Sequence, residues 1–161
     1  MTRLLLINPN ISDSVSDLIR AEAERSASPG TQIEVLTAPF GVAYIETRFE
    51  ALIGAYAVAQ LAAEHHARFD AVIVAAFGDP GLGGLREALP CPVTGLTESA
   101  LASAHLLGNR ISVIAISQRI RPGIAKSSRP MASRHAWPAS VRSTARSRAS
   151  ARCRTSTRRR C

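Results

Sequence analysis

The chain has 161 residues, enough for one domain with a hydrophobic core, and a formal net charge of +8. The charge is uneven: residues 1–118 contain all 12 acids and carry −5, whereas residues 119–161 contain 13 basic residues and no acid. No apolar run reaches the ~20 residues of a membrane-spanning helix, and the run Leu4–Ile7 is too short for a signal peptide. These features exclude a membrane-spanning protein, and we expect a soluble, cytoplasmic one.

Strands and helices are predicted to alternate along residues 1–118. Apolar or alternating runs predict strands at Arg3–Ile7, Gln32–Thr37, Asp70–Phe77, Val93–Gly95 and Ile111–Ser117. Between them, helical spacing predicts helices from Ser12 or Asp13 to Ser28, from about Thr47 to Arg68 and over Leu82–Leu89. It also predicts a helix that Thr97 caps and that ends at Leu107. This order, with short connections, favours an α/β fold: a parallel sheet with helices on both faces, Rossmann-like or flavodoxin-like.

The first two predicted helices have recognisable apolar spacing. The first places Ile11, Val15, Leu18 and Ile19 on one face. The second has Phe49, Leu52, Ile53, Tyr56 and Ala63 at helical spacing. Its remaining positions are rich in alanine, which suits a helix packed closely on a sheet.

The stretch Asp70–Leu82 organises the rest of the chain. It predicts a buried strand that breaks into a tight Gly/Pro loop, and ligands of open α/β sheets bind beyond the carboxyl ends of such strands. Five polar loops are expected at that edge: Asn8–Asn10, Thr37–Gly41, Gly78–Gly81, Thr94–Ser99 and Ser117. Each residue alone suits a turn or a cap. Together they predict a small-molecule site.

Other common sites are not indicated. The segment Gly78–Gly84 does not fit G-x-G-x-x-G and lacks the Lys-Ser/Thr pair of a phosphate-binding loop. His65 and His66 are adjacent, so they point to different faces of a helix, and His105 is isolated. The cysteines (Cys91, Cys153 and Cys161) are odd in number and widely spaced. We expect no metal, no disulfide framework and no nucleotide cofactor.

Four motifs, in order and covering residues 1–121, resemble the aspartate/glutamate/hydantoin racemase superfamily, closest to its hydantoin and allantoin racemase branch. They are Leu6–Asn10 (LINPN), Ile45–Thr47 (IET), Ala76–Leu82 (AFGDPGL) and Pro92–Ala100 (PVTGLTESA). The resemblance implies two pseudo-symmetric α/β domains and racemisation without a cofactor. In that chemistry one cysteine thiolate removes the α-proton and a second thiol returns a proton from the opposite face.

The resemblance also implies a substrate and its binding residues. The substrate would be a hydantoin, allantoin or an amino acid. Its carboxylate or ring amide would be held by Asn8 and Asn10 together with groups of the later loops. The residues implied there are Phe77, Gly78, Asp79, Thr97, Glu98 and Ser117.

The sequence departs from the family pattern at its chemistry. The first cysteine is expected immediately before Phe77, where this chain has Ala76, which cannot exchange a proton. Cys91 lies in a Pro-Cys-Pro connector and suits a small buried hydrophobe, so Asp79 is the nearest titratable alternative. The second domain does not follow Ser117 either. We therefore expect domain 1–118 to be incomplete and the truncated chain to be inactive as a two-thiol racemase.

Residues 119–161 are rich in Arg, Ser and Ala and have neither helical nor strand periodicity. This composition predicts disorder. One interpretation is a frameshift of a GC-rich gene. The other is a basic arm, so that the protein is a non-catalytic α/β scaffold whose tail binds polyanions. Apolar surface left exposed beside the missing half would favour homo-oligomers or aggregation.

Overall fold

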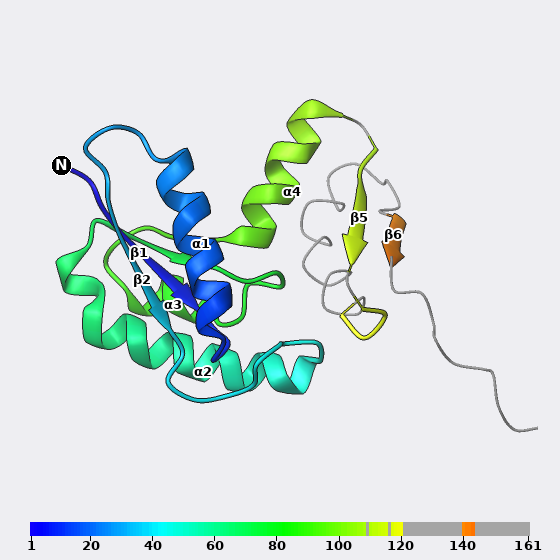
Figure 1. Cartoon of the computed structure of the whole chain (residues 1–161), viewed down its shortest axis with the longest axis horizontal. Coiled ribbons are helices and arrows are strands. Elements are labelled where there is room, and N and C mark those ends of the chain that lie inside the picture. The colour runs from blue at the N-terminus through cyan, green and yellow to red at the C-terminus, as the bar shows by residue number, and fades with distance from the viewer. Residues whose placement is uncertain (109, 116, 121–139, 144–161) are drawn as a thin grey trace, which may run out of the picture.

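A computed structural model describes residues 1–108, 110–115, 117–120 and 140–143. Its centre is a parallel four-stranded sheet in the order β2-β1-β3-β4 (Figure 1). The strands are β1 (Arg3–Asn8), β2 (Gln32–Thr37), β3 (Ala71–Val74) and β4 (Val93–Gly95). The predicted parallel α/β fold is therefore confirmed.

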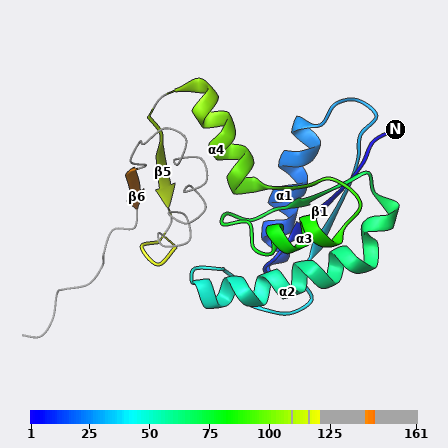
Figure 2. The ribbon, with the colours of Figure 1, turned by 180° about the vertical axis from the view of Figure 1, so that it is seen from behind.

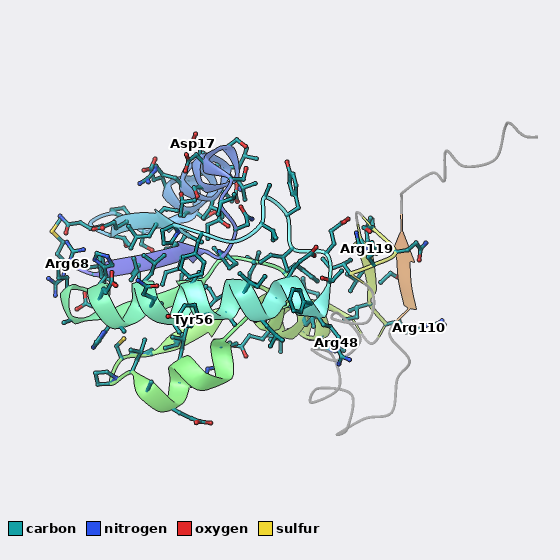
Figure 3. The ribbon with its side chains drawn as sticks, turned by 90° about the horizontal axis from the view of Figure 1, so that it is seen from below. Asp17, Arg48, Tyr56, Arg68, Arg110 and Arg119 are labelled. Carbon is teal, nitrogen blue, oxygen red and sulfur yellow. The ribbon has the colours of Figure 1, made fainter. Side chains whose placement is uncertain are left out.

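Helices cover both faces of this sheet. They are α1 (Asp13–Ser26), α2 (Arg48–His65), α3 (Leu82–Ala88) and α4 (Leu96–Leu107), and a short 3₁₀ turn, His66–Arg68, follows α2. Figure 3 shows α1 on one side of the strands and α2 and α3 on the other. The core lies between the strands and α2 and α3, and comprises Leu5, Ile7, Val58, Leu61, Ala62, Val72, Val74, Leu82, Leu85 and Val93. In the part of the chain that the structure describes, no helix is long and apolar enough to cross a membrane.

The strand order creates a switch point between β1 and β3. From β1 the chain passes through α1 on one face to reach β2, and then returns through α2 on the other face to β3. The loops that leave β1 and β3 therefore diverge to opposite faces of the sheet. A crevice outside the carboxyl ends at such a point is where this class of fold binds ligands.

The buried face of α1 differs from the predicted one. Leu18 is 71% exposed and Ile11 is 43% exposed, whereas Ser16 is buried. The Ser16 hydroxyl lies 2.7 Å from the Thr37 hydroxyl at the end of β2 and accepts a hydrogen bond from Asn8 at the end of β1. Polar bonds at the sheet edge, rather than the largest apolar side chains, set the rotation of α1.

The buried face of α2 is lined by small residues and short aliphatic ones. Gly54, Ala57, Val58, Leu61 and Ala62 are buried, while the large side chains recognised in the sequence lie outside: Phe49 is 72% exposed, Leu52 69% and Tyr56 66%. Close packing explains why small residues face inward. A Cβ at Gly54 would lie 3.2 Å from the Pro9 carbonyl oxygen, so only a small residue lets the helix approach the loop after β1.

The predicted fifth strand does not extend the main sheet. Strand β5 (Ser112–Ala115) pairs in parallel with β6 (Ser140–Ser143) in a separate two-stranded sheet. Figures 1 and 2 show the reason, because α4 leads the chain away from β4 and places β5 beyond its far end. Strand β6 belongs to the segment expected to lack strands, which corrects that expectation at residues 140–143. Residues 121–139 and 144–161 lie outside the described part, so their predicted disorder and frameshift origin stay predictions.

Reciprocal hydrogen bonds cap the N-terminus of α2. The Thr47 hydroxyl accepts from the Glu50 backbone N–H at 3.2 Å, and the Glu50 carboxylate accepts from the backbone N–H groups of Thr47 (2.7 Å) and Glu46 (2.8 Å). These bonds lower the pKa of Glu50, with the Glu46 N–H contributing most. The cap fixes the loop that enters α2 from the carboxyl edge of the sheet.

Replacing this cap gives a stability prediction. Thr47→Ala should lower the free energy of unfolding by about 1 kcal/mol, because it leaves a helix N–H without its acceptor. Ser12→Ala is the matched control: Ser12 occupies the same position before α1 but makes no side-chain capping bond. Chemical denaturation measures both, and an equal loss in the two variants would contradict the assignment.

Candidate functional site

The carboxyl ends of the four strands lie at one edge. Asn8 pairs with Thr37, and Val74 lies in register with both Ile7 and Gly95. This geometry brings the loops after β1, β2, β3 and β4 together, as expected from the sequence. Ser117 is placed differently, because it follows β5 of the smaller sheet, where its hydroxyl accepts from the Arg119 backbone N–H at 3.1 Å.

Asn8 is fully buried, and its amide is used inside the loop. Its Nδ2 donates to Asn10 Oδ1 (3.1 Å), to the Ser12 carbonyl (3.2 Å) and to Ser16 Oγ (2.9 Å), and its Oδ1 accepts from the Asn10 N–H (3.1 Å). The side chain therefore shapes the Asn8–Asn10 loop and ties it to α1. Such bonding is typical of asparagine in turns.

Asn10 retains one polar group for a ligand. Its Oδ1 accepts from Asn8 Nδ2 and from the Ser12 N–H at 2.9 Å. Among the described residues, no partner bonds its Nδ2, and the residue is 9% exposed. The Asn10 amide can thus donate to a carbonyl or carboxylate oxygen at the edge of the sheet.

Asp79 joins the loop after β3 to the start of α4. Its Oδ1 accepts from the Thr97 N–H at 2.8 Å and its Oδ2 from the Glu98 N–H at 2.9 Å, so one carboxylate caps the first turn of the helix. In return, the Thr97 hydroxyl accepts from the Gly78 N–H. Thr97 was expected to cap α4 itself; the structure assigns the cap to Asp79 and buries Thr97 completely.

The cap requires an unusual backbone and an absent side chain. Gly78 (φ 102°) and Asp79 (φ 48°) both have left-handed conformations, which turn the Asp79 side chain toward α4. At Gly95, a Cβ would lie 2.3 Å from the Asp79 carboxyl carbon. Glycine at residue 95 therefore leaves the space that the carboxylate occupies.

Glu98 is committed to an ion pair. Its carboxylate pairs with the guanidinium of Arg86 on α3, whose NH1 lies 3.0 Å from Oε2. Arg86 also donates from Nε to the Val93 carbonyl at 2.9 Å. Glu98 thus fastens α3 and β4 to α4, and its contribution to the site is to hold these elements in place.

A small pocket lies beside the β3 loop. It has a volume of about 60 Å³ and is lined by Ile45, Glu46, Thr47, Arg48, Ala51, Phe77, Gly78, Arg119 and Ile120. The segment after β5 forms one wall of the pocket. An ion pair holds it there, since Arg119 NH1 lies 3.3 Å from Glu46 Oε2. The pocket therefore lies between the capped start of α2 and the loop that begins at Ala76.

A larger hollow of about 460 Å³ lies at the opposite edge. Arg3, Gln32, Ile33, Glu34, Arg68 and Phe69 line it. Its two arginines already have carboxylate partners, Asp70 at 3.6 Å from Arg3 and Glu34 at 3.4 Å from Arg68. Because it lies at the amino ends of the strands and its charges are paired, we place the functional site at the other edge.

In the described part of the chain, few side chains near residue 76 can exchange a proton. Ala76 is half-buried, and its carbonyl accepts from the Asp79 N–H at 3.2 Å within the turn. Cys91, between α3 and β4, packs against the core, and the described residues contain no cluster of three or more metal-ligating side chains. Cys153 and Cys161 lie outside the described part. Asp79 is therefore the titratable group nearest to Ala76 in the chain.

Two parts of the site were missed from the sequence. Glu46 and Thr47 were recognised as a motif but not as pocket residues, although the Thr-x-x-Glu spacing of a capping box was present. Arg119 was counted with the basic tail. Its partner Glu46 is 73 residues away in the sequence, so no local pattern signals the contact.

The space beside Gly95 gives a sharp prediction. Gly95→Ala should lower the free energy of unfolding by about 1 to 3 kcal/mol, because the new methyl displaces the Asp79 carboxylate from the start of α4. Gly83→Ala and Gly84→Ala in α3 are matched controls, since a Cβ there meets nothing within 4 Å. These should stabilise the protein by up to about 1 kcal/mol. Thermal unfolding of the three variants measures these changes in stability. A Gly95→Ala variant as stable as the wild type would contradict the close packing of residue 95 against Asp79.

The pKa of Asp79 predicts a pH dependence. Burial raises the pKa of Asp79 above its ordinary value, although the N–H groups of Thr97 and Glu98 oppose the shift by favouring the charged form. The folded state then holds the proton to a higher pH than the unfolded chain. The contribution of Asp79 to stability therefore falls as pH rises from the unfolded pKa of about 3.9 toward the folded one.

Denaturation of the wild type and Asp79→Asn across this pH range measures the effect. The difference in unfolding free energy, wild type minus variant, should decrease as pH rises through the window. A difference that grows with pH would show that the N–H bonds outweigh burial.

Comparisons with known proteins agree with the motifs. The sequence model of the Asp/Glu/hydantoin racemase family matches residues 4–158, beyond the 1–121 covered by those motifs. A hydantoin racemase from Paenarthrobacter aurescens is 33% identical over 121 residues, which cover 74% of this chain and 51% of the relative. A hydantoin racemase from a Pseudomonas species is 31% identical over 120 residues, covering 74% of this chain and 48% of the relative.

Solved structures show the same likeness. The allantoin racemase of Pseudomonas fluorescens superposes with a TM-score of 0.82 at 37% identity, covering 88% of this chain and 60% of that one. The allantoin racemase of Klebsiella pneumoniae gives a TM-score of 0.77 at 33% identity, covering 81% and 54%. The chain spans about half the length of the curated relatives it matches. With almost its whole length matched by the family model, the chain belongs to the Asp/Glu/hydantoin racemase family.

Proposed function

We propose that the carboxyl edge of the main sheet binds a small molecule with a carbonyl, carboxylate or ring amide, of the hydantoin, allantoin or amino acid class. The observation that carries this proposal is the pocket between Phe77–Gly78 and Ile45–Arg48. It is lined by the loop that leaves β3, one of the two strands at the switch point, and Phe77 directly follows residue 76 in that loop. The names of the similar proteins, hydantoin and allantoin racemases, support the same substrate class.

The proposed site divides its residues into two groups. Asn8, Asp79, Thr97 and Glu98 are positioning residues, because their polar groups are bonded within the loops and to α3 and α4. Asn10, Phe77 and Gly78 are the proposed ligand contacts. Asn10 offers an amide N–H that has no partner among the described residues, and Phe77 and Gly78 line the pocket. Ser117 acts indirectly, through the segment that carries Arg119.

We expect no two-thiol racemisation at this site. Ala76 has no exchangeable proton, and it stands at the position where the resemblance places the family's first cysteine. Asp79 does not replace it as a base, because both carboxylate oxygens accept helix N–H groups and the side chain is turned toward α4. The proposal is therefore ligand binding without efficient proton transfer. Cofactor independence and a cytoplasmic location are part of this proposal, and polyanion binding by residues 119–161 stays a prediction from their charge.

Restoring the thiol tests the proposal. Ala76→Cys should increase exchange of the α-proton of hydantoins or allantoin in deuterated water by at least about tenfold over the wild type, because a thiol positioned beside the substrate carbon supplies a base. The exchange should occur without matching racemisation, since no second thiol among the described residues faces the ligand. Proton NMR follows exchange, and circular dichroism of the substrate follows racemisation.

The matched control is Ala75→Cys. Residue 75 is buried and its N–H bonds to the Ile7 carbonyl, so a thiol there should not reach the ligand. Rapid exchange of the α-proton by the wild type would overturn the proposal that the site lacks efficient proton transfer. Folded Ala76→Cys protein with no gain, and with no shift of the Gly78 amide resonance on addition of hydantoin or allantoin, would overturn the site.

A further inference from the structure

The pocket beside the β3 loop is too small for a whole ligand. This pocket, lined by residues 45–48, 51, 77–78 and 119–120, is named here the β3 pocket. Its volume is about 60 Å³, whereas clefts that enclose a complete small molecule measure ~300–1,000 Å³. A water molecule occupies ~30 Å³ in the liquid, so the pocket has room for about two or three methylene-sized groups. It can therefore take one substituent of a ligand.

The polar groups of the β3 pocket already have partners within the protein, with one exception. The Glu46 carboxylate pairs with Arg119, and the Thr47 hydroxyl accepts from the Glu50 N–H in the helix cap. The Gly78 N–H donates to a hydroxyl group of α4. A polar substituent that entered the pocket would lose its hydrogen bonds to water and would not gain these groups as partners.

The exception is Arg48, which has no partner among the described residues. Three and four residues further along the helix, where an acid could pair with it, stand Ala51 and Leu52. Figure 3 shows Arg48 at the beginning of α2, and the residue is exposed. A long cationic side chain beside apolar surface keeps its charged end in water. Arg48 therefore belongs to the rim of the β3 pocket, outside the part that a substituent fills.

The side chains that remain for a ligand are apolar and half-buried, so each has surface left to bury. They are Ile45, Ala51, Phe77 and Ile120. Ile45 is fixed by close packing, because a Cβ at Gly54 would lie only 2.8 Å from its Cδ1. Ala51 is fixed by the helix, where its N–H donates to the Thr47 carbonyl at 3.0 Å. Each methylene group buried against such walls raises affinity about fourfold.

We propose that the β3 pocket binds an apolar substituent of the ligand, so that the preferred ligand is a hydantoin with a short alkyl substituent or the corresponding aliphatic amino acid. This inference rests on the proposed function, because it specifies the ligand of the same site. Ala51 is the specificity-determining residue, since its small side chain leaves the space that the substituent fills. The ureido group of allantoin would bring N–H and carbonyl groups against walls that offer them no partner.

A matched pair of ligands tests the proposal on the full chain. 5-Isobutylhydantoin and allantoin share one ring, and their substituents have the same number of non-hydrogen atoms and the same branching, apolar in one and polar in the other. The isobutyl compound should bind at least about tenfold more tightly. Affinity should also rise about fourfold per carbon atom from hydantoin to 5-methylhydantoin and 5-ethylhydantoin. Titration of the Gly78 amide resonance by NMR measures each dissociation constant.

Two variants change the size of the β3 pocket. Ala51→Leu should weaken binding of 5-isobutylhydantoin at least about tenfold and leave that of unsubstituted hydantoin within about twofold, because it fills the space for the substituent. Ile120→Ala should weaken binding of 5-isobutylhydantoin about fivefold, because it removes part of a wall. Ala21→Leu is the matched control at an exposed alanine of α1, and should change neither affinity. Circular dichroism confirms that each variant is folded.

The outcomes separate this inference from the proposed function. Allantoin that binds as tightly as 5-isobutylhydantoin, or equal effects of Ala51→Leu and Ala21→Leu, would overturn the inference and leave the site in place. Tighter binding of 5-carboxymethylhydantoin than of 5-isobutylhydantoin would also overturn it, because Arg48 would then hold the substituent. No shift of the Gly78 resonance with any of these compounds would overturn the proposed function together with the inference.

Discussion

The site depends on one carboxylate at the start of one helix. Asp79 accepts the N–H groups of Thr97 and Glu98, and this pair of bonds fixes the loop after β3 against α4. These two hydrogen bonds form only because Gly78 and Asp79 adopt left-handed backbone conformations and because Gly95 has no side chain. The Gly-Asp-Pro-Gly sequence and the distant Gly95 are thus parts of a single device that sets the shape of the carboxyl edge.

Much of the fold could be predicted because it follows from local patterns. Strand and helix order came from apolar runs and turn residues, and a βαβ order with short connections restricts the topology to a parallel sheet. The buried faces of α1 and α2 could not be predicted by size of side chain. Ser16 faces inward for its hydrogen bonds, and Gly54 faces inward for close packing, so the large side chains Leu18 and Tyr56 lie outside.

The sequence predicted which polar residues lie at the carboxyl edge better than it predicted the role of each residue there. Polar groups at strand ends were expected to meet a ligand, but a buried polar group must first satisfy its own hydrogen bonds. Asn8 and Asp79 do so within the protein, which makes them supports of the loops. The β5–β6 pair and the Glu46–Arg119 contact join distant segments, and no periodicity in either segment encodes them.

Ala76 shows that the shape of this site and its chemistry are separable. The turn from residue 76 to residue 79 is held by the Ala76 carbonyl, the Asp79 side chain and the Thr97 hydroxyl, and none of these bonds involves the side chain of residue 76. A thiol or a methyl group at residue 76 is therefore compatible with the same loop. Stability exerts little pressure to keep a cysteine there, so only the demand for proton transfer would retain it. The loop that shapes the pocket can therefore keep its conformation whether or not residue 76 carries a group that exchanges a proton.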